Sequence, residues 1–300
     1  MKRSEKDGED YLGLPESSIS ILLVMDGSIH SQDAALGLSA LPLPVGSKVL
    51  VLAVAQEFNQ VTRAEPYILL KERQAHEIRN ALRKAHTSLS KGHIHIEMMI
   101  RSGQSAEVIT RTATEYDVDL IVLGTEENTT KPKISPGSTT QKVIKYAQQP
   151  VLVLRKHLST ERFLLVVDGS TMATKALDYL LQWPWPTELD VFVLHVSFAP
   201  FFPWLRSKKV REGEKNARIK NGQAIVNRVV ESLRSGGLQA AGLAVKRDAT
   251  YQILKLAEEK QVDLILLSTN GRPKLIRYLL GNVSHRVVHD APCSVLVVRT

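Results

Sequence analysis

The feature that most constrains this sequence is that it repeats itself. Residues 118–125 read VDLIVLGT, and residues 262–269 read VDLILLST. Near the start of each half, ILLVMDGS at residues 21–28 matches FLLVVDGS at residues 163–170. The first pair of matching stretches is 144 residues apart and the second pair is 142 residues apart, so the two halves differ in length by two residues between these stretches. The chain is therefore predicted to contain one domain twice.

Each copy would hold about 140 residues, which is a normal domain size and too long for a unit of a solenoid. We place the domains at residues 18–157 and 158–300. The charged segment at residues 1–17 is expected to be a mobile tail.

Within each half, short apolar runs alternate with amphipathic segments, which predicts the order βαβαβαβαβ. The runs, such as LILL at residues 264–267, lack polar alternation, and this favours parallel strands covered on both faces. Right-handed crossovers then predict an α/β fold of two tandem open five-stranded parallel sheets, in the order 3-2-1-4-5, with helices on both faces.

In that strand order, the direction of winding reverses between strands 1 and 4 of each half. A ligand is expected in the crevice beyond the carboxyl ends of these two strands. Asp26 and Gly124 would flank the crevice in the first half, and Asp168 and Ser268 would flank it in the second.

Several local patterns predict individual elements. Ser28 or Ser31 can cap the helix that follows the first strand, with Ala34, Ala35, Leu38 and Leu41 as its inner face. A long charged helix is expected at residues 67–89, and a strand is expected near residues 243–246. Residues 93–100, HIHIEMMI, alternate strictly and predict an outer strand with one exposed face.

The last strand of each half, VLVLR at residues 151–155 and SVLVVR at residues 294–299, is apolar and would lie at the edge of its sheet. Because unprotected edges of this kind pair with other strands, the two halves are expected to pair with each other as an intramolecular pseudo-dimer. A further homodimer is compatible with this arrangement.

Composition excludes several classes of protein. No apolar run approaches the roughly 20 residues that span a bilayer, and the first residues lack an apolar signal core. The single cysteine, Cys293, excludes an internal disulfide or a CxxC metal site and fits the reducing cytoplasm. His93, His95 and Glu97 are interpreted as an exposed strand face, so no metal site is predicted.

The formal net charge of +8 raises the question of nucleic-acid binding. The densest basic run, at residues 206–220, contains Glu212 and Glu214 and lacks interleaved aromatic residues that could stack on bases. It is interpreted as a solvated helix face, and neither nucleic acid nor a membrane is an expected partner.

Known catalytic and nucleotide motifs are absent from the turns after the first strand of each half. DGSIHS and DGSTMA match neither the GxGxxG of dinucleotide-binding enzymes nor the GxxxxGK[ST] of P-loop proteins. No nucleophile, base and orienting group can be assembled from the sequence, so the protein is not expected to be an enzyme.

Each half resembles a universal stress protein domain. The resemblance rests on DGS after strand 1, on the VDLI strand and on the loop before the last helix. It implies a fold similar to the adenine nucleotide alpha hydrolases and a cytoplasmic role in the stress response. The nucleotide-binding branch of that family carries Gly-x2-Gly-x9-Gly-Ser/Thr in the loop, where glycines allow the backbone to approach phosphates.

Both halves depart from this motif while keeping its spacing. The first half has Glu127 at the second glycine, and the second half has Ser268 and Asn282 at the first glycine and the hydroxyl position. Glu127 places a negative charge near the expected phosphates, which costs on the order of 1 kcal/mol. If only one half binds a nucleotide, the second half is therefore favoured.

The resemblance implies ATP or AMP as the ligand, with Mg²⁺ accompanying ATP. The implied nucleotide contacts are Asp26, Gly27, Val54, Gly124, Gly137, Ser138 and Thr139 in the first half, and Asp168, Gly169, Val196, Gly271, Arg272, Gly281 and Asn282 in the second.

Two alternatives stay open for these residues. The aspartates can simply form turns after their strands, and the valines can be ordinary core residues. The corresponding alternative for the whole protein is a universal stress protein that has lost nucleotide binding and serves as a protein-interaction scaffold.

Overall fold

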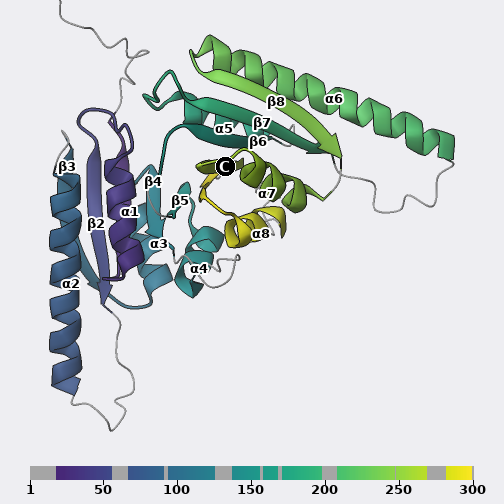
Figure 1. Ribbon diagram of the computed structural model, residues 1–300. Helices are drawn as coiled ribbons and strands as arrows, with labels where there is room; N and C mark the ends of the chain where they lie inside the picture. The colour runs from purple at the N-terminus through teal and green to yellow at the C-terminus, as the bar shows by residue number, and fades with distance from the viewer. Residues whose placement is uncertain are drawn as a thin grey trace, which may run out of the picture.

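The computed structural model describes residues 18–55, 67–90, 94–125, 137–155, 158–167, 171–197, 208–246, 248–268 and 282–298 (Figure 1). The tail predicted at residues 1–17 lies outside these ranges. The elements of the first half are β1 (Ser20–Met25), α1 (Ile29–Ser39), β2 (Lys48–Ala55), α2 (Tyr67–Leu89), β3 (His95–Ser102), α3 (Ser105–Glu115), β4 (Leu120–Gly124), α4 (Ser138–Tyr146) and β5 (Val151–Leu154). Those of the second half are β6 (Arg162–Val167), α5 (Thr171–Leu181), β7 (Asp190–Ser197), α6 (Lys208–Ser235), β8 (Gln239–Lys246), α7 (Ala249–Glu259), β9 (Leu264–Ser268), α8 (Asn282–Asp290) and β10 (Ser294–Val298).

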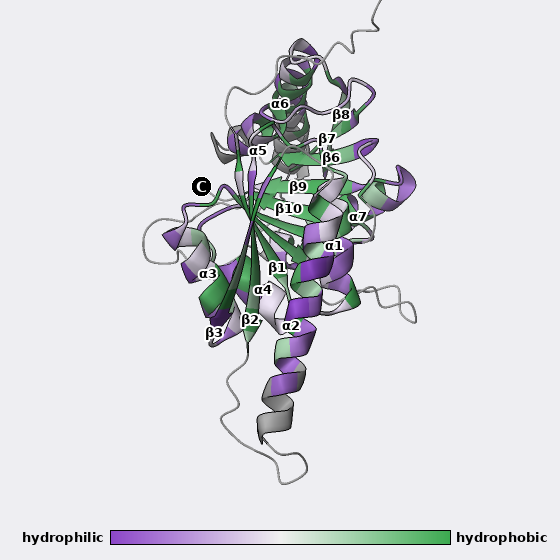
Figure 2. Ribbon diagram, turned by 90° about the vertical axis from the view of Figure 1, so that its left-hand side faces the viewer, coloured by the Kyte–Doolittle hydropathy of each residue, from purple (hydrophilic) through white to green (hydrophobic). Residues whose placement is uncertain are grey.

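The strands form one ten-stranded sheet in the order β3-β2-β1-β4-β5-β10-β9-β6-β7-β8. Taken separately, each half has the predicted order 3-2-1-4-5 with parallel neighbours, so this expectation is confirmed. The strands fan out with the usual twist, and their apolar residues dominate the interior (Figure 2).

The two halves meet through β5 and β10, which pair antiparallel with Leu152 opposite Leu296. The predicted pairing of the last strands is therefore confirmed. Arg155, directly after β5, is only 4% exposed. Its two Nη atoms donate hydrogen bonds to the carbonyl oxygens of Val288 (2.7 Å) and Ala291 (2.6 Å) at the end of α8. A cation of the first half thus caps a helix of the second.

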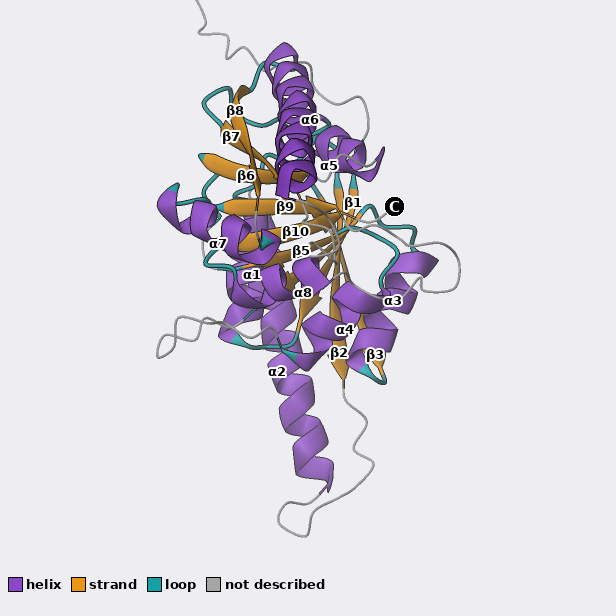
Figure 3. Cartoon of the chain, turned by 90° about the vertical axis from the view of Figure 1, so that its right-hand side faces the viewer, coloured by secondary structure: helices purple, strands orange, loops and turns teal. Residues whose placement is uncertain are grey.

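A separate core covers each face of the sheet, and each core continues across the junction. One core gathers residues of α1, α2, α5 and α6, and the other gathers residues of α3, α4, α7 and α8. Helices accordingly lie on both sides of the strands (Figure 3). Alternate residues of β10 face the two cores, with Leu296 in the first and Val295 in the second.

The aspartate of each VDLI segment has a structural role at the amino ends of the strands. Asp119 accepts a hydrogen bond from the backbone N–H of Ser20 (2.7 Å), and Asp263 accepts one from the N–H of Arg162 (2.9 Å). Each bond ties the start of strand 4 to the start of strand 1 in the same half. The repeated aspartate is therefore explained by strand alignment.

The outer strand of the second half is protected by the long helix α6, which runs beside it (Figure 1). The Gln223 side chain accepts a hydrogen bond from the N–H of Ala244 (3.1 Å), and Nε of Arg234 donates to the carbonyl of Ala240 (3.0 Å). Gly242 permits the close approach, because a Cβ there would lie 2.6 Å from Val226. Through these hydrogen bonds the two side chains satisfy N–H and C=O groups of β8 that an edge strand would otherwise offer to a strand of another chain.

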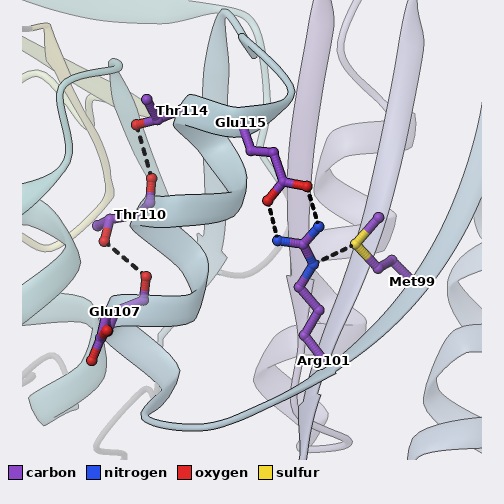
Figure 4. A network of polar contacts seen from close by, with 6 residues as sticks. All are labelled: Met99, Arg101, Glu107, Thr110, Thr114 and Glu115. Atoms are coloured by element: carbon purple, nitrogen blue, oxygen red, sulfur yellow. Dashed lines mark hydrogen bonds and ion pairs between the residues drawn. The ribbon is translucent and has the colours of Figure 1, made fainter.

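The outer strand of the first half is held by charged side chains. Lys48 on β2 forms an ion pair with Glu97 on β3 (2.8 Å). Further along β3, Arg101 makes a two-pronged ion pair with Glu115 of α3, and its Nε contacts the sulfur of Met99 (Figure 4). The guanidinium also lies over the Tyr116 ring, 5.5 Å from its centre. This exposed network fixes α3 against the edge of the sheet.

Most predicted elements agree with the structure, and two strands differ. The helix at residues 67–89 and the Ser28 cap, which accepts from the Ser31 N–H, are confirmed. The strand predicted at residues 93–100 spans His95–Ser102, because β3 follows β2 to its last residue. β8 begins four residues before the predicted Leu243, since the pairing with β7 overrides the weak strand propensity of Ala and Gly.

His95 and Glu97 lie exposed on the edge strand as expected, while His93 lies outside the described residues. Within the described ranges, no three His, Cys, Asp or Glu side chains are grouped closely enough to hold a metal ion. None of the helices in these ranges combines the length and the apolar character needed to cross a membrane.

Cys293 is expected to be unreactive in the folded protein. The thiol is buried, and burial raises its pKa to about 12, so the nucleophilic thiolate is scarce at neutral pH. A thiol reagent such as dithionitrobenzoate should therefore label the native chain slowly and the urea-unfolded chain rapidly, with one thiol per chain. Rapid labelling without denaturant would contradict this burial.

Candidate functional site

The candidate site lies where the carboxyl ends of β1 and β4 lie next to each other. These strands pair in parallel, with Leu23 opposite Val122. From β1 the chain continues to β2 on one side, while β4 continues to β5 on the other. The winding direction therefore reverses between them, as predicted, and loop backbone at their ends is free to line a crevice.

The turn after β1 is closed by the side chain of Asp26. Its Oδ1 accepts hydrogen bonds from the N–H (3.0 Å) and the hydroxyl (2.6 Å) of Ser28. Gly27 between them has φ +87°, a conformation that favours glycine. Desolvation acts to raise the pKa of Asp26, but the hydrogen bonds from Ser28 outweigh it and hold the pKa below its usual value. The carboxylate is thus ionised at neutral pH, and it forms the turn anticipated as one alternative.

Gly124, the last residue of β4, is required by packing. A Cβ at this position would collide with the backbone carbonyl of His30 in the first turn of α1 and would lie 2.9 Å from the nitrogen of Ser31. In the second half, Ser268 ends β9 and carries a Cβ without a positive φ. The close approach between helix and strand in the first half is therefore not shared by the second.

Gly137 differs from Gly124, because nothing in the described part of the chain requires a glycine there. A Cβ would meet none of the described atoms within 4 Å. The backbone has φ −55° and ψ 157°, which any residue can adopt. The residue lies at the N-cap of α4, and no side chain caps this helix. Ser138 is exposed and Thr139 is half-buried. Because α4 connects the parallel strands β4 and β5, its N-terminus lies at the edge that holds the carboxyl ends of β1 and β4.

Thr125, directly after Gly124, is a further residue at the site and was not among the predicted ones. Its side chain is 5% exposed, and Oγ1 has no hydrogen-bond partner in the described part of the chain. Buried hydroxyls normally have a partner, so the lack of one at the end of β4 calls for an explanation. The signal in the sequence was the threonine repeated after both VDLI strands, at Thr125 and Thr269.

Val54 and Val196 belong to the core face that carries α3, α4, α7 and α8. Val54 is half-buried near the end of β2, whereas Val196 is 5% exposed. Val54 therefore keeps an accessible apolar surface beside the first crevice, and Val196 is mainly a core residue.

The second crevice is described only at its borders. Asp168, Gly169, Gly271, Arg272 and Gly281 lie outside the described residues. Asn282 begins α8, but its side chain also lies outside the description. His195, one residue before Val196, is buried and contacts the carbonyl of Val167 through Nδ1 (3.0 Å), close to the end of β6.

Comparison with known proteins supports the repeat. The model of the universal stress protein family matches residues 20–155 and 159–299. Universal stress protein YxiE of Bacillus subtilis is 29% identical over 154 residues, covering 46% of this chain and 98% of that protein. A universal stress protein of Methanothermobacter thermautotrophicus is 30% identical over 142 residues, covering 46% of this chain and 96% of its own length.

Solved structures extend the likeness to the whole chain. A universal stress protein from Archaeoglobus fulgidus has a TM-score of 0.69 at 19% identity, covering 96% of this chain and 98% of that one. A protein from Pseudomonas aeruginosa, described as a putative universal stress protein, has a TM-score of 0.56 at 15% identity, covering 94% of both chains. At these identities, the structures show a shared fold.

Proposed function

Because the chain belongs to the universal stress protein family and carries its domain twice, we propose that it is a cytoplasmic stress-response module that binds an adenine nucleotide, ATP or AMP, without significant catalysis. The ligand would lie in the crevice between strands 1 and 4 of a half. With ATP, Mg²⁺ would accompany the phosphates.

The observation that carries the proposal is the N-terminus of α4 behind Gly137, which no side chain of the described residues caps. The first N–H groups of a helix have no partner inside it, and together with the positive end of the helix dipole they favour an anion such as a phosphate. Among the described residues, a Cβ at Gly137 would meet open space, and neither packing against them nor backbone conformation explains why the residue is a glycine. Close approach of a ligand to the backbone supplies that reason.

The neighbouring residues fit the remaining parts of a nucleotide. The unpartnered hydroxyl of Thr125 is a hydrogen-bonding group at the end of β4. Val54 offers a half-buried apolar surface on which a base can pack. The residues described around the first crevice are thus groups that could bind a nucleotide. We propose no catalytic role for them.

A scaffold that does not bind nucleotide is the second candidate, and two observations favour it. Both hydrogen bonds to Asp26 come from its own turn, and Gly124 is explained by its contact with α1. These two matches to the nucleotide-binding pattern can therefore persist for structural reasons alone. Equilibrium dialysis of the full chain against labelled ATP and AMP distinguishes the candidates, because binding weaker than about 1 mM would leave only the scaffold.

The variant Glu127→Gly is expected to tighten ATP binding in the first half by several-fold to about tenfold. A carboxylate near the phosphates costs on the order of 1 kcal/mol, which corresponds to this change in affinity. The dialysis measurement on the wild type and the variant gives the ratio directly.

The double variant Glu127→Gly/Gly137→Val is the matched control, since a valine side chain would occupy the open space beside the helix N-terminus. It should lose the gained affinity. Unchanged affinity in Glu127→Gly would remove the first crevice from the proposal.

A further inference from the structure

A hollow lies at the amino ends of β7 and β8, whereas the crevice of the second half is expected at the carboxyl ends of that half's strands. The hollow has a volume of about 400 Å³, within the range of small-molecule sites, and none of the residues assigned to the nucleotide crevice lines it. Its lining comprises Asp190, Val191, Phe192, Arg234, Gln239, Ala240 and Ala241.

The corresponding place in the first half is filled by an ion pair. There Lys48 of β2 reaches Glu97 of β3, which lies opposite Leu50. In the second half, Ala241 lies opposite Phe192 in the same register, and Asp190 stands at the start of the strand where the first half has a lysine. The second half has therefore replaced a bridge between strands by a short side chain and a carboxylate, and this leaves the hollow open.

The rim of the hollow carries charges of both signs. Asp190 and Arg234 both line it, and none of the ion pairs seen among the described residues includes either of them. Nε of Arg234 is held by the carbonyl of Ala240 at 3.0 Å, which fixes the guanidinium and leaves its Nη groups for an acceptor.

Apart from Gln239, the remaining wall is apolar. Phe192 is half-buried, and the methyl group of Ala241 is exposed beside it. The ammonium of Lys260 lies 5.2 Å from the centre of the Phe192 ring, so a second cation is close to the same wall. A ligand that fits must offer an apolar group to this wall together with one positive and one negative charge.

We propose that this hollow binds a free α-amino acid with an apolar side chain. Its ammonium group pairs with Asp190, its carboxylate pairs with Arg234, and its side chain packs on Phe192 and Ala241. This proposal does not depend on nucleotide binding, because none of the residues assigned to either crevice lines the hollow.

Isothermal titration calorimetry on the full chain tests the proposal with L-phenylalanine and L-leucine. At least one of them should bind with a dissociation constant below about 1 mM. For L-phenylalanine, the analogues 3-phenylpropionate and 2-phenylethylamine each lack one charge and should bind at least about tenfold more weakly. Failure of both amino acids, or equal binding of either analogue, overturns the proposal.

Variants locate the ligand. Ala241→Glu restores the side chain found at Glu97, and Asp190→Asn removes the charge with little change in shape. Each is expected to weaken amino-acid binding at least about tenfold. Glu97→Ala, the reverse change in the first half, should leave binding unchanged, and thermal unfolding verifies that each variant is folded. Unaltered binding in Ala241→Glu, or competition by ATP, would place the ligand elsewhere and overturn the assignment.

Discussion

Replacing Arg155 by methionine is expected to lower the free energy of unfolding by about 2 to 4 kcal/mol, because it leaves two buried carbonyl groups without their hydrogen-bond donor. The guanidinium donates to the carbonyls of Val288 and Ala291, at 2.7 Å and 2.6 Å, in the junction between the halves. Methionine keeps most of the apolar length of the side chain, so the loss reports the hydrogen bonds more than the packing. Without the guanidinium, two buried carbonyls at the end of α8 have lost their donor.

Urea unfolding followed by intrinsic fluorescence measures the effect. Trp183, Trp185 and Trp204 are the three tryptophans of the chain, and all lie in the second half, which contains α8. Arg101→Met is the matched control, since Arg101 also makes a two-pronged contact but with the exposed Glu115 (Figure 4). Exposed ion pairs contribute little, so this variant should unfold near the wild-type midpoint. Equal midpoints for the two variants would show that the buried contact does not stabilise the junction.

The variant Gly124→Ala is expected to destabilise the first half by about 1 to 3 kcal/mol, the usual cost of forcing one extra carbon into a packed interior. The added Cβ would meet the backbone of His30 and Ser31, which cannot rotate away as a side chain would. The first turn of α1, with its Ser28 cap, must therefore shift. Hydrogen exchange of the α1 amides, together with the urea midpoint, measures this change.

The variant Gly137→Ala is the control that shows whether a glycine of this crevice is needed for packing. It changes the other glycine of the same crevice, where a Cβ meets nothing within 4 Å, and it should leave stability within a few tenths of a kcal/mol of the wild type. If Gly124→Ala were equally harmless, packing would no longer explain that glycine, and its place in a nucleotide site would gain weight.

The repeat made the fold predictable. Once the two halves were aligned, the buried runs, the right-handed crossovers and the apolar last strands led to the observed strand order and to the pairing of β5 with β10. These features depend on local patterns and on rules that hold for every parallel sheet. Ser28 as a helix cap was predictable for the same reason, because its partner Ser31 is three residues away.

The contacts that distinguish one crevice from the other could not be derived in this way. Gly124 belongs to a motif, yet its requirement comes from a carbonyl of α1 that only the folded chain brings near. Arg155 follows a strand as many arginines do, and its partners are more than 130 residues away. The unpartnered hydroxyl of Thr125 likewise becomes evident only when its surroundings are known.

The antiparallel contact between β5 and β10 has a consequence for how this protein can evolve. In a symmetric dimer of identical chains, any mutation changes both copies of a pocket at once. Here the two pockets are encoded by different parts of one chain, and they open toward opposite edges of the sheet. A mutation in one pocket therefore leaves the other unchanged. The ion pair of Lys48 and Glu97 in one half, and the hollow beside Asp190 in the other, are a divergence that a dimer of identical chains could not have.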